Sequence, residues 1–200
     1  MTSVQKGHFM RVLVLGATGR IGRMMQWAWA NTAGISPLWQ TRENAPPGWI
    51  GCDILHDPEG LKTACVRADV ILTLAGVTPA PGADMDQNSA LALAVQRAAG
   101  GRPHLLASSA AVYGRAGGPC RESDTVQPAA PYGAAKLAME RAVLAEGGAF
   151  VVKVLQGADE PALFAAMRAR FNNVRRMKPA ASRSDSTELY LIATDFKGGE

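Results

Sequence analysis

Short apolar runs alternate with longer segments of helical spacing along most of the chain. Residues 11–15 form the first apolar run, and a glycine-containing loop follows it. In residues 20–30 the apolar side chains then recur near helical spacing. A short run of this kind predicts a strand buried on both faces, and the spacing after it predicts an amphipathic helix. The chain is therefore expected to open with a strand, a glycine loop and a helix.

The same alternation continues toward the C-terminus. Asp57 and Pro58 provide a suitable N-cap and first turn for one of the later helices. Further strands are predicted at 35–40, 49–52, 70–74, 104–108 and 150–155, and further helices at 58–66, 83–99 and 131–145. Strands that alternate with helices favour a doubly wound α/β fold of the Rossmann type. We expect a parallel sheet in the order 3-2-1-4-5-6, with helices on both faces and ligands beyond the carboxyl ends of the strands.

The pattern changes after residue 155. Residues 161–171 place Leu163, Phe164 and Met167 on one helical face, but the rest of the tail is polar and basic. We therefore expect one nucleotide-binding domain over residues 1–155. Residues 156–200 are expected to form a short helix and a basic tail of disorder-prone composition.

Composition narrows the class of protein. The chain has 200 residues and a formal net charge of +4, and it lacks a long uninterrupted apolar run. Its first nine residues lack the apolar stretch of a secretory signal, which predicts a cytoplasmic protein that does not enter a membrane. The three cysteines, Cys52, Cys65 and Cys120, form no CxxC pair, so a metal site is not expected.

Basic residues gather in the C-terminal part of the sequence. These residues are Arg168, Arg170, Arg175, Arg176, Lys178 and Arg183. Such a cluster can attract nucleic acid, but no nucleic-acid-binding module or pattern of stacking aromatic residues accompanies it. We interpret it as a solvated face and expect no nucleic-acid partner.

The first loop has the composition of a phosphate-binding turn. Gly16, Gly19 and Gly22 would allow a tight turn, close approach of a phosphate to the backbone, and close packing of the helix. The N-terminus of the helix would then face a pyrophosphate. The loop residues predicted to contact a dinucleotide are Gly16, Thr18, Gly19, Arg20, Ile21 and Gly22.

A tyrosine and a lysine are spaced for proton transfer. Tyr132 and Lys136 lie four residues apart on a predicted helix, hence one turn apart on one face. A phenol is a poor base at neutral pH, and a neighbouring cation stabilises its ionised form. Ser109 follows the fifth predicted strand, and its hydroxyl could orient a substrate oxygen.

These motifs together resemble the extended short-chain dehydrogenases/reductases, in the NAD-dependent epimerase/dehydratase family. The glycine spacing GxxGxxG and the pair YxxxK carry the resemblance, which covers residues 10–155. It implies that Ser109, Tyr132 and Lys136 are catalytic and that Tyr132 and Lys136 also contact the cofactor. Glu122, Pro128 and Pro131 resemble the loop before the catalytic helix in the branch that acts on nucleotide sugars.

The resemblance also implies further contacts with a bound NAD(P). Asp53 would accept a hydrogen bond from the adenine amino group, with Ile54 beside the ring. The segment Leu74, Ala75 and Gly76 would leave room for the ribose and phosphates. Asn88 would fix the backbone of the active site.

The preference between NAD and NADP depends on the end of the second strand. Residues 38–42 contain no carboxylate to hold the adenosine-ribose hydroxyls. Arg42 could instead meet a 2′-phosphate, because its guanidinium fits phosphate oxygens in a bidentate fork. This pattern favours NADP slightly over NAD.

The resemblance implies an oxidoreductase or isomerase acting on a hydroxyl of a nucleotide sugar, and a homodimer that pairs through the helices at 83–99 and 131–145. Tyr132 would take the hydroxyl proton while hydride passes to the nicotinamide. Two alternatives stay open: a catalytically silent NAD(P)-binding sensor or assembly module, and an NADPH-dependent carbonyl reductase. The family's C-terminal substrate domain is missing, so the substrate pocket is either reduced, completed by another chain, or lost through truncation or a change of reading frame.

Overall fold

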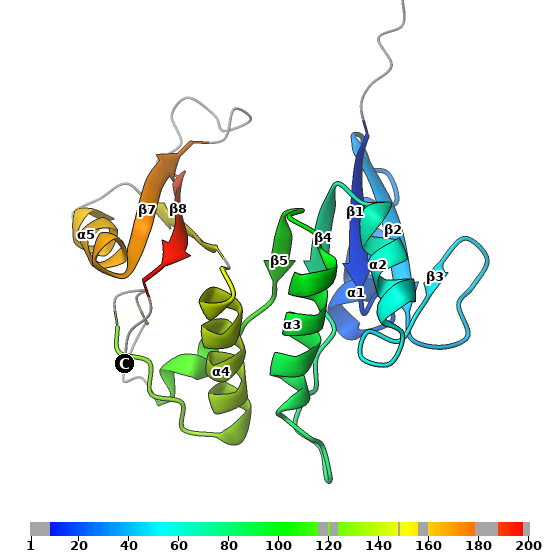
Figure 1. Cartoon of the computed structure of the whole chain (residues 1–200), viewed down its shortest axis with the longest axis horizontal. Helices are drawn as coiled ribbons and strands as arrows, with labels where there is room; N and C mark the ends of the chain where they lie inside the picture. Colours follow the sequence, from blue (N-terminus) through cyan, green and yellow to red (C-terminus); the bar gives the residue numbers. More distant parts are fainter. Residues whose placement is uncertain are drawn as a thin grey trace, which may run out of the picture. The chain divides into compact units, whose positions relative to one another are not determined.

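The chain forms two compact units, Met1–Ser109 and Ala110–Glu200. The structure, a computed structural model, describes residues 9–115, 120, 124–147, 149–155, 160–178 and 188–197. Figure 1 traces the elements of both units along the chain. The extent expected for the nucleotide-binding domain, residues 1–155, stays a prediction.

The first unit is built on a parallel sheet of five strands in the order β3-β2-β1-β4-β5. Its strands are β1 (Met10–Leu15), β2 (Ile35–Thr41), β3 (Ile50–Gly51), β4 (Val70–Thr73) and β5 (His104–Leu106). Its helices are α1 (Arg20–Trp29), α2 (Pro58–Val66) and α3 (Gln87–Ala98). The predicted α/β class, the parallel pairing and the order of these five strands are confirmed.

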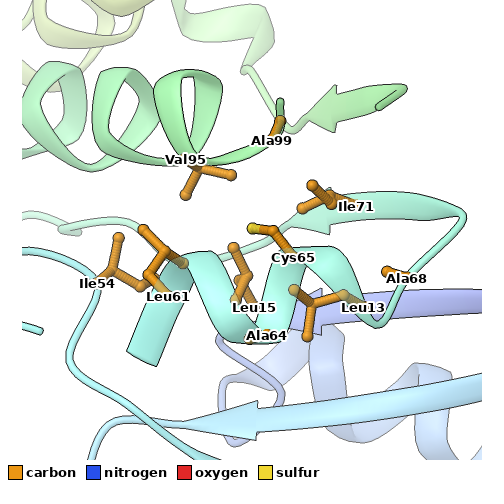
Figure 2. Packing of buried hydrophobic residues seen from close by; sticks show 10 residues of the cluster. All are labelled: Leu13, Leu15, Ile54, Leu61, Ala64, Cys65, Ala68, Ile71, Val95 and Ala99. Carbon is orange, nitrogen blue, oxygen red and sulfur yellow. The ribbon is translucent and has the colours of Figure 1, made fainter. Parts of the chain in front are cut away.

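Alternate residues of β1 enter two separate cores. Leu13 and Leu15 are fully buried on the face that α2 and α3 cover. Figure 2 shows Leu61 and Cys65 of α2 and Val95 of α3 converging with these two leucines. Asp57 caps the start of α2, as predicted, because its side chain accepts a hydrogen bond from the Gly60 N–H at 2.9 Å.

On the opposite face, Val12 and Val14 pack with a group of tryptophans. Trp29, Trp39 and Trp49 are half-buried against this second core. The rings of Trp29 and Trp39 are 6.0 Å apart between centroids, and those of Trp39 and Trp49 are 6.2 Å apart. Since β1 is covered on both faces, its four residues from Val12 to Leu15 are all apolar, as in other central parallel strands.

The second unit contains an antiparallel sheet of three strands in the order β6-β8-β7. The strands are β6 (Phe150–Leu155), β7 (Phe171–Met177) and β8 (Glu188–Phe196). The unit also contains the 3-10 helix η1 (Ala110–Tyr113), α4 (Pro131–Ala145) and α5 (Glu160–Arg170). Leu163 and Met167 of α5 pack against Leu189, Leu191 and Ala193 of β8 to form its core.

The sixth strand differs from the expectation. β6 has the predicted bounds, but it pairs antiparallel with β8 and does not extend the parallel sheet. The tail of disorder-prone composition that was expected after a short helix contains β7 and β8. In β8, Leu189, Leu191 and Ala193 are buried, but Tyr190 and Ile192 between them are apolar as well, so the sequence shows no clear period-2 signal.

Some predicted features lie outside the described residues, among them Glu122 and Arg183. Within the described part of the chain, no helix is both long and apolar enough to cross a bilayer. The cytoplasmic location and the homodimer stay predictions.

Candidate functional site

A cleft of about 460 Å³ lies at the carboxyl edge of the parallel sheet. It is formed where the loops after β1, β2, β3 and β4 meet, which is where ligands bind in doubly wound sheets. The residues that line it are Gly16, Thr18, Gly19, Gln40, Thr41, Arg42, Glu43, Asp53, Ile54, Leu55, His56, Leu74, Ala75, Gly76, Val77, Gln87 and Leu91.

The cleft gathers most of the cofactor contacts predicted in the first unit. Gly16, Thr18, Gly19, Arg42, Asp53, Ile54, Leu74, Ala75 and Gly76 all line it. Arg20, Ile21, Gly22 and Asn88 do not line it, and Ile21 is instead 54% exposed on α1. Gly22 has a packing role, because a Cβ at this position would collide with the backbone of Ala17.

Position 16, directly after β1 and close to the end of β4, requires a glycine. Its φ is +80°, and a Cβ there would lie 2.7 Å from the backbone nitrogen of Ala75. The loop closes tightly behind it, since the Gly19 N–H donates to the Gly16 carbonyl at 3.1 Å. Only glycine combines this conformation with this close approach, so the backbone itself forms the floor of the cleft.

Asp53 organises the loop after β3. Its Oδ1 accepts hydrogen bonds from the N–H groups of Leu55 at 2.8 Å and His56 at 2.9 Å. Partial burial raises the pKa of Asp53, but these two N–H groups and the His56 imidazole together bring the pKa below its ordinary value. The carboxylate is therefore ionised near neutral pH, and Ile54 beside it is buried in the apolar wall.

A carboxylate that the sequence analysis missed lies at the end of β2. Glu43 lines the cleft beside Arg42, and their side chains form an ion pair at 3.2 Å. Glu43 lies one position beyond residues 38–42, the segment in which no carboxylate was found. Arg42 thus faces a carboxylate of its own chain, which weakens its assignment as a binder of a 2′-phosphate.

Asn88 holds the loop after β4, which forms one wall of the cleft, through hydrogen bonds to its backbone. Its Oδ1 accepts from the Val77 N–H, and its Nδ2 donates to the carbonyls of Val77 and Met85, at 3.0–3.1 Å. The side chain is 1% exposed. Asn88 therefore holds the loop in place without lining the cleft.

The three predicted catalytic residues fall in different units. Ser109 ends the first unit, whereas Tyr132 and Lys136 lie on α4 of the second. Lys136 is buried, with its Nζ 3.7 Å from the Met139 sulfur and 6.0 Å from the centroid of the Tyr132 ring. Burial lowers the pKa of Lys136 from its ordinary value, and Glu140 opposes this effect.

The second unit carries several exposed cationic side chains, called here the cationic strip. Its members are Arg168, Arg170, Arg175, Lys178 and Lys197. The Lys197 Nζ donates to the Arg168 carbonyl at 2.9 Å, so the ends of α5 and β8 lie together. Arg176 is held differently, because its guanidinium pairs with Glu160 at 2.9 Å and lies 3.7 Å from the centroid of the Phe164 ring.

Comparison with known proteins places the chain among methyltransferases. The model of the FtsJ-like methyltransferase family matches residues 40–196, well over half of the chain. The chain belongs to this family.

Curated relatives of this family member include two bacterial enzymes named ribosomal RNA large subunit methyltransferase E. The one from Azorhizobium caulinodans is 57% identical over 58 residues, which are 29% of this chain and 24% of that protein. The one from Xanthobacter autotrophicus is 53% identical over 68 residues, or 33% of this chain and 27% of that protein. The chain thus matches about a quarter of the length of these relatives.

Solved structures resemble the chain in fold. One is a short-chain dehydrogenase/reductase superfamily protein from Agrobacterium tumefaciens with bound NAD, with 28% identity and a TM-score of 0.55. The likeness covers 68% of this chain and 44% of that one. It agrees with the doubly wound sheet of the first unit, whose glycine loop precedes the region that the family model matches.

The family corrects several expectations from the sequence. The assignment to the extended short-chain dehydrogenases/reductases is contradicted, and with it the epimerase, dehydratase and reductase activities and the nucleotide-sugar substrate. NAD(P) as the cofactor is contradicted by the same match. The catalytic assignment of Ser109, Tyr132 and Lys136 stays a prediction. The exclusion of nucleic acid is contradicted by relatives named for ribosomal RNA. The shared cause is that glycine loops of this type recur in doubly wound folds of different chemistry.

Proposed function

We propose that the chain is an S-adenosylmethionine-dependent RNA methyltransferase, with the adenosine part of the cofactor in the cleft of the first unit. The observation that carries the proposal is the meeting, at one sheet edge, of the Gly16 backbone floor, the Glu43 carboxylate and the apolar wall at Ile54. Family membership supplies the reaction class.

The residues present fit this cofactor. A carboxylate such as Glu43 can accept hydrogen bonds from both ribose hydroxyls. Ile54 and Leu91 supply apolar surface for the adenine ring, and ionised Asp53 orders the N–H groups beside it. The N-terminus of α1 follows the floor of the cleft, and its dipole favours the carboxylate of the methionine part.

Bound S-adenosylmethionine supplies an electrophilic methyl group on a sulfonium sulfur. The chain's own contribution is to bind and orient that molecule through its adenosine. Because an adenosine is common to S-adenosylmethionine and the dinucleotides, residues that bind it cannot alone distinguish the two. This shared part explains why the loop pattern suggested NAD(P).

The cationic strip fits the RNA partner. Arg168, Arg170 and Arg175 are exposed, and guanidinium groups form bidentate contacts with phosphate oxygens. A net charge of +4 adds a general attraction to polyanions. The strip is assigned to RNA backbone contacts that position the substrate and carry no sequence information.

Cofactor binding is tested by isothermal titration with S-adenosylmethionine, S-adenosylhomocysteine, NADH and NADPH. We expect the first two to bind and Glu43→Gln to weaken them about tenfold, the effect of losing hydrogen bonds to a charged acceptor. Glu59→Gln is the matched control, because Glu59 is exposed on α2 and does not line the cleft. Binding of NADH or NADPH without binding of S-adenosylmethionine would overturn the proposal.

RNA binding and methyl transfer are tested with in vitro transcribed large-subunit ribosomal RNA and radiolabelled S-adenosylmethionine. We expect label in the RNA, and we expect Arg175→Ala to lower the slope of affinity against salt by about one. Arg67→Ala is the control, since Arg67 is an exposed arginine of the first unit. RNA that stays unlabelled and binds equally well to both variants would contradict the RNA assignment.

A further inference from the structure

Gln40 connects two walls of the cleft through its buried side chain. It is the penultimate residue of β2 and is 2% exposed. Its Oε1 accepts a hydrogen bond from the Gly16 N–H at 2.9 Å, and its Nε2 donates to the Cys52 carbonyl at 2.6 Å. The Gln40 carbonyl also accepts from the Ala17 N–H at 3.1 Å. One residue thus bonds to the glycine loop twice and to the end of β3 once.

The two side-chain bonds require an amide at this position. The Gly16 N–H needs an acceptor and the Cys52 carbonyl needs a donor, and the two ends of one carboxamide supply both. A carboxylate would lack the donor, and an apolar side chain would lack both. Since buried polar groups without partners are costly, either change would leave the loop free to move away from the end of β3.

The bonds of Gln40 act on the residues that form the cleft. Gly16 is the floor, and Cys52 is the residue directly before Asp53. Moving either segment would change the width available to an adenosine between the Gly16 backbone and the Asp53 loop. Asn88 holds the third wall in a comparable way, through the backbone of Val77.

We infer that Gln40 is a positioning residue for the adenosine cofactor, setting the separation of the glycine loop and the Asp53 loop. The inference rests on the proposed function for the identity of the ligand. Gln40 lines the cleft at its base, and its side-chain amide is engaged by the protein on both ends. It therefore acts through Gly16 and Cys52, and binding should fall when the cleft is less well ordered in advance.

The test compares Gln40→Met with Thr73→Val. Thr73 is 1% exposed, its hydroxyl bonds to His104 at 2.8 Å, and it does not line the cleft, so Thr73→Val is matched in burial. We expect Gln40→Met to raise the Kd for S-adenosylhomocysteine about tenfold, as for the loss of one to two hydrogen bonds, and Thr73→Val to leave it within about twofold. Equal effects of the two variants on Kd at matched loss of stability would overturn the inference.

A second readout follows the bonds themselves. Hydrogen exchange of the Gly16 and Ala17 amides, measured by NMR without ligand, should become faster in Gln40→Met and stay unchanged in Thr73→Val. Gln40→Glu keeps the acceptor for Gly16 and should restore part of the Gly16 protection. Unchanged exchange at Gly16 in a folded Gln40→Met would overturn the inference.

The failure of this inference can be told apart from failure of the proposed function. If the native chain does not bind S-adenosylhomocysteine, the proposed function fails, and the Gln40 variants are then titrated with adenosine alone while Gly16 exchange is read as before. If Gln40→Met does not fold, the inference is tested on the native chain, through the hydrogen exchange of the Gln40 side-chain amide. Slow exchange of the Gln40 side-chain amide protons supports the inference, and fast exchange overturns it.

Discussion

The two sheets bury their strands in different ways. In β1 four consecutive residues, Val12 to Leu15, are at most 5% exposed, because helices and tryptophans cover both faces. In β8 the buried residues alternate, with Leu189, Leu191 and Ala193 directed into the core and Tyr190 and Ile192 half-buried between them. The first pattern is typical of a central parallel strand, and the second of an antiparallel strand with one core face.

This difference separates what each unit can do. A sheet covered on both faces leaves its loop edge as the place for a ligand, and the cleft is found there. The second unit instead presents charged side chains from the end of α5 and from β7. The first unit thus holds the cleft proposed for the cofactor, and the second holds the exposed arginines proposed to contact RNA.

The largest expected loss of stability comes from placing a buried carboxylate in β1 or in β8. Leu13→Asp and Val14→Asp should both cost about 4 kcal/mol or more and unfold the first unit, because either face of β1 buries the carboxylate. Leu191→Asp should do the same in the second unit, whereas Thr194→Asp should be tolerated since Thr194 is exposed. Circular dichroism during urea unfolding measures this. Tolerance of Val14→Asp would show that β1 has only one core face.

Lowering the pH should destabilise the first unit through His104 of β5. Burial lowers the pKa of His104 to about 4, and its ring bonds to Thr73 and Gln96. The unfolded chain therefore takes up this proton first, so stability is lost as the pH falls from about 6.5 toward 4, by up to about 3 kcal/mol.

The measurement is the free energy of unfolding against pH for the native chain and for His104→Gln. His104→Gln should flatten the curve over that range. Both histidines that the structure describes, His56 and His104, belong to the first unit. An equally steep curve for His104→Gln would contradict the assignment.

A smaller effect separates backbone strain from close contact at the cleft floor. Gly16→Ala should cost about 2 to 3 kcal/mol, since it adds a collision with the Ala75 backbone to an unfavourable φ. Gly34 has a similar φ of +82° with nothing near its Cβ position, so Gly34→Ala should cost only about 1 kcal/mol. Thermal unfolding of both variants gives the difference. Equal costs would mean that the loops after β1 and β4 are farther apart than described.

The smallest expected effect lies in the second unit. Arg176→Lys should cost about 1 kcal/mol, because lysine loses both the forked contact with Glu160 and the flat contact with Phe164. Arg175→Lys should change stability by less than about 0.5 kcal/mol, since Arg175 is exposed. Denaturant midpoints of the two variants test this. A larger loss of stability for Arg175→Lys than for Arg176→Lys would contradict the structural role given to Arg176.

The sequence predicted the first unit well because its signals are local. A continuous apolar run, a glycine loop and an Asp57-Pro58 cap each determine an element by themselves, and the order of the five strands follows from the alternation. The pairing of β6 was not predicted, since it depends on β8, whose alternation of buried residues does not stand out within the apolar run from Leu189 to Ala193. The cleft residues followed from the strand ends, whereas Gln40 was missed because a buried amide within a strand has no motif.

The chemistry was the least accessible part. Residues that bind an adenosine indicate where a cofactor lies, but not whether hydride or methyl is transferred. Tyr132 and Lys136 have the spacing expected of a proton-transfer pair and are neighbours on α4, yet the chain belongs to a methyltransferase family. Local geometry alone therefore did not identify the reaction.

Tryptophan and tyrosine, the two strongly fluorescent residue types, are divided between the two units. All four tryptophans, Trp27, Trp29, Trp39 and Trp49, belong to the first unit, and all three tyrosines, Tyr113, Tyr132 and Tyr190, belong to the second. Light absorbed only by indole would excite the first unit alone, and Trp39 directly precedes Gln40 at the base of the cleft. The native chain thus carries its own fluorescent reporter for one unit, without any added label.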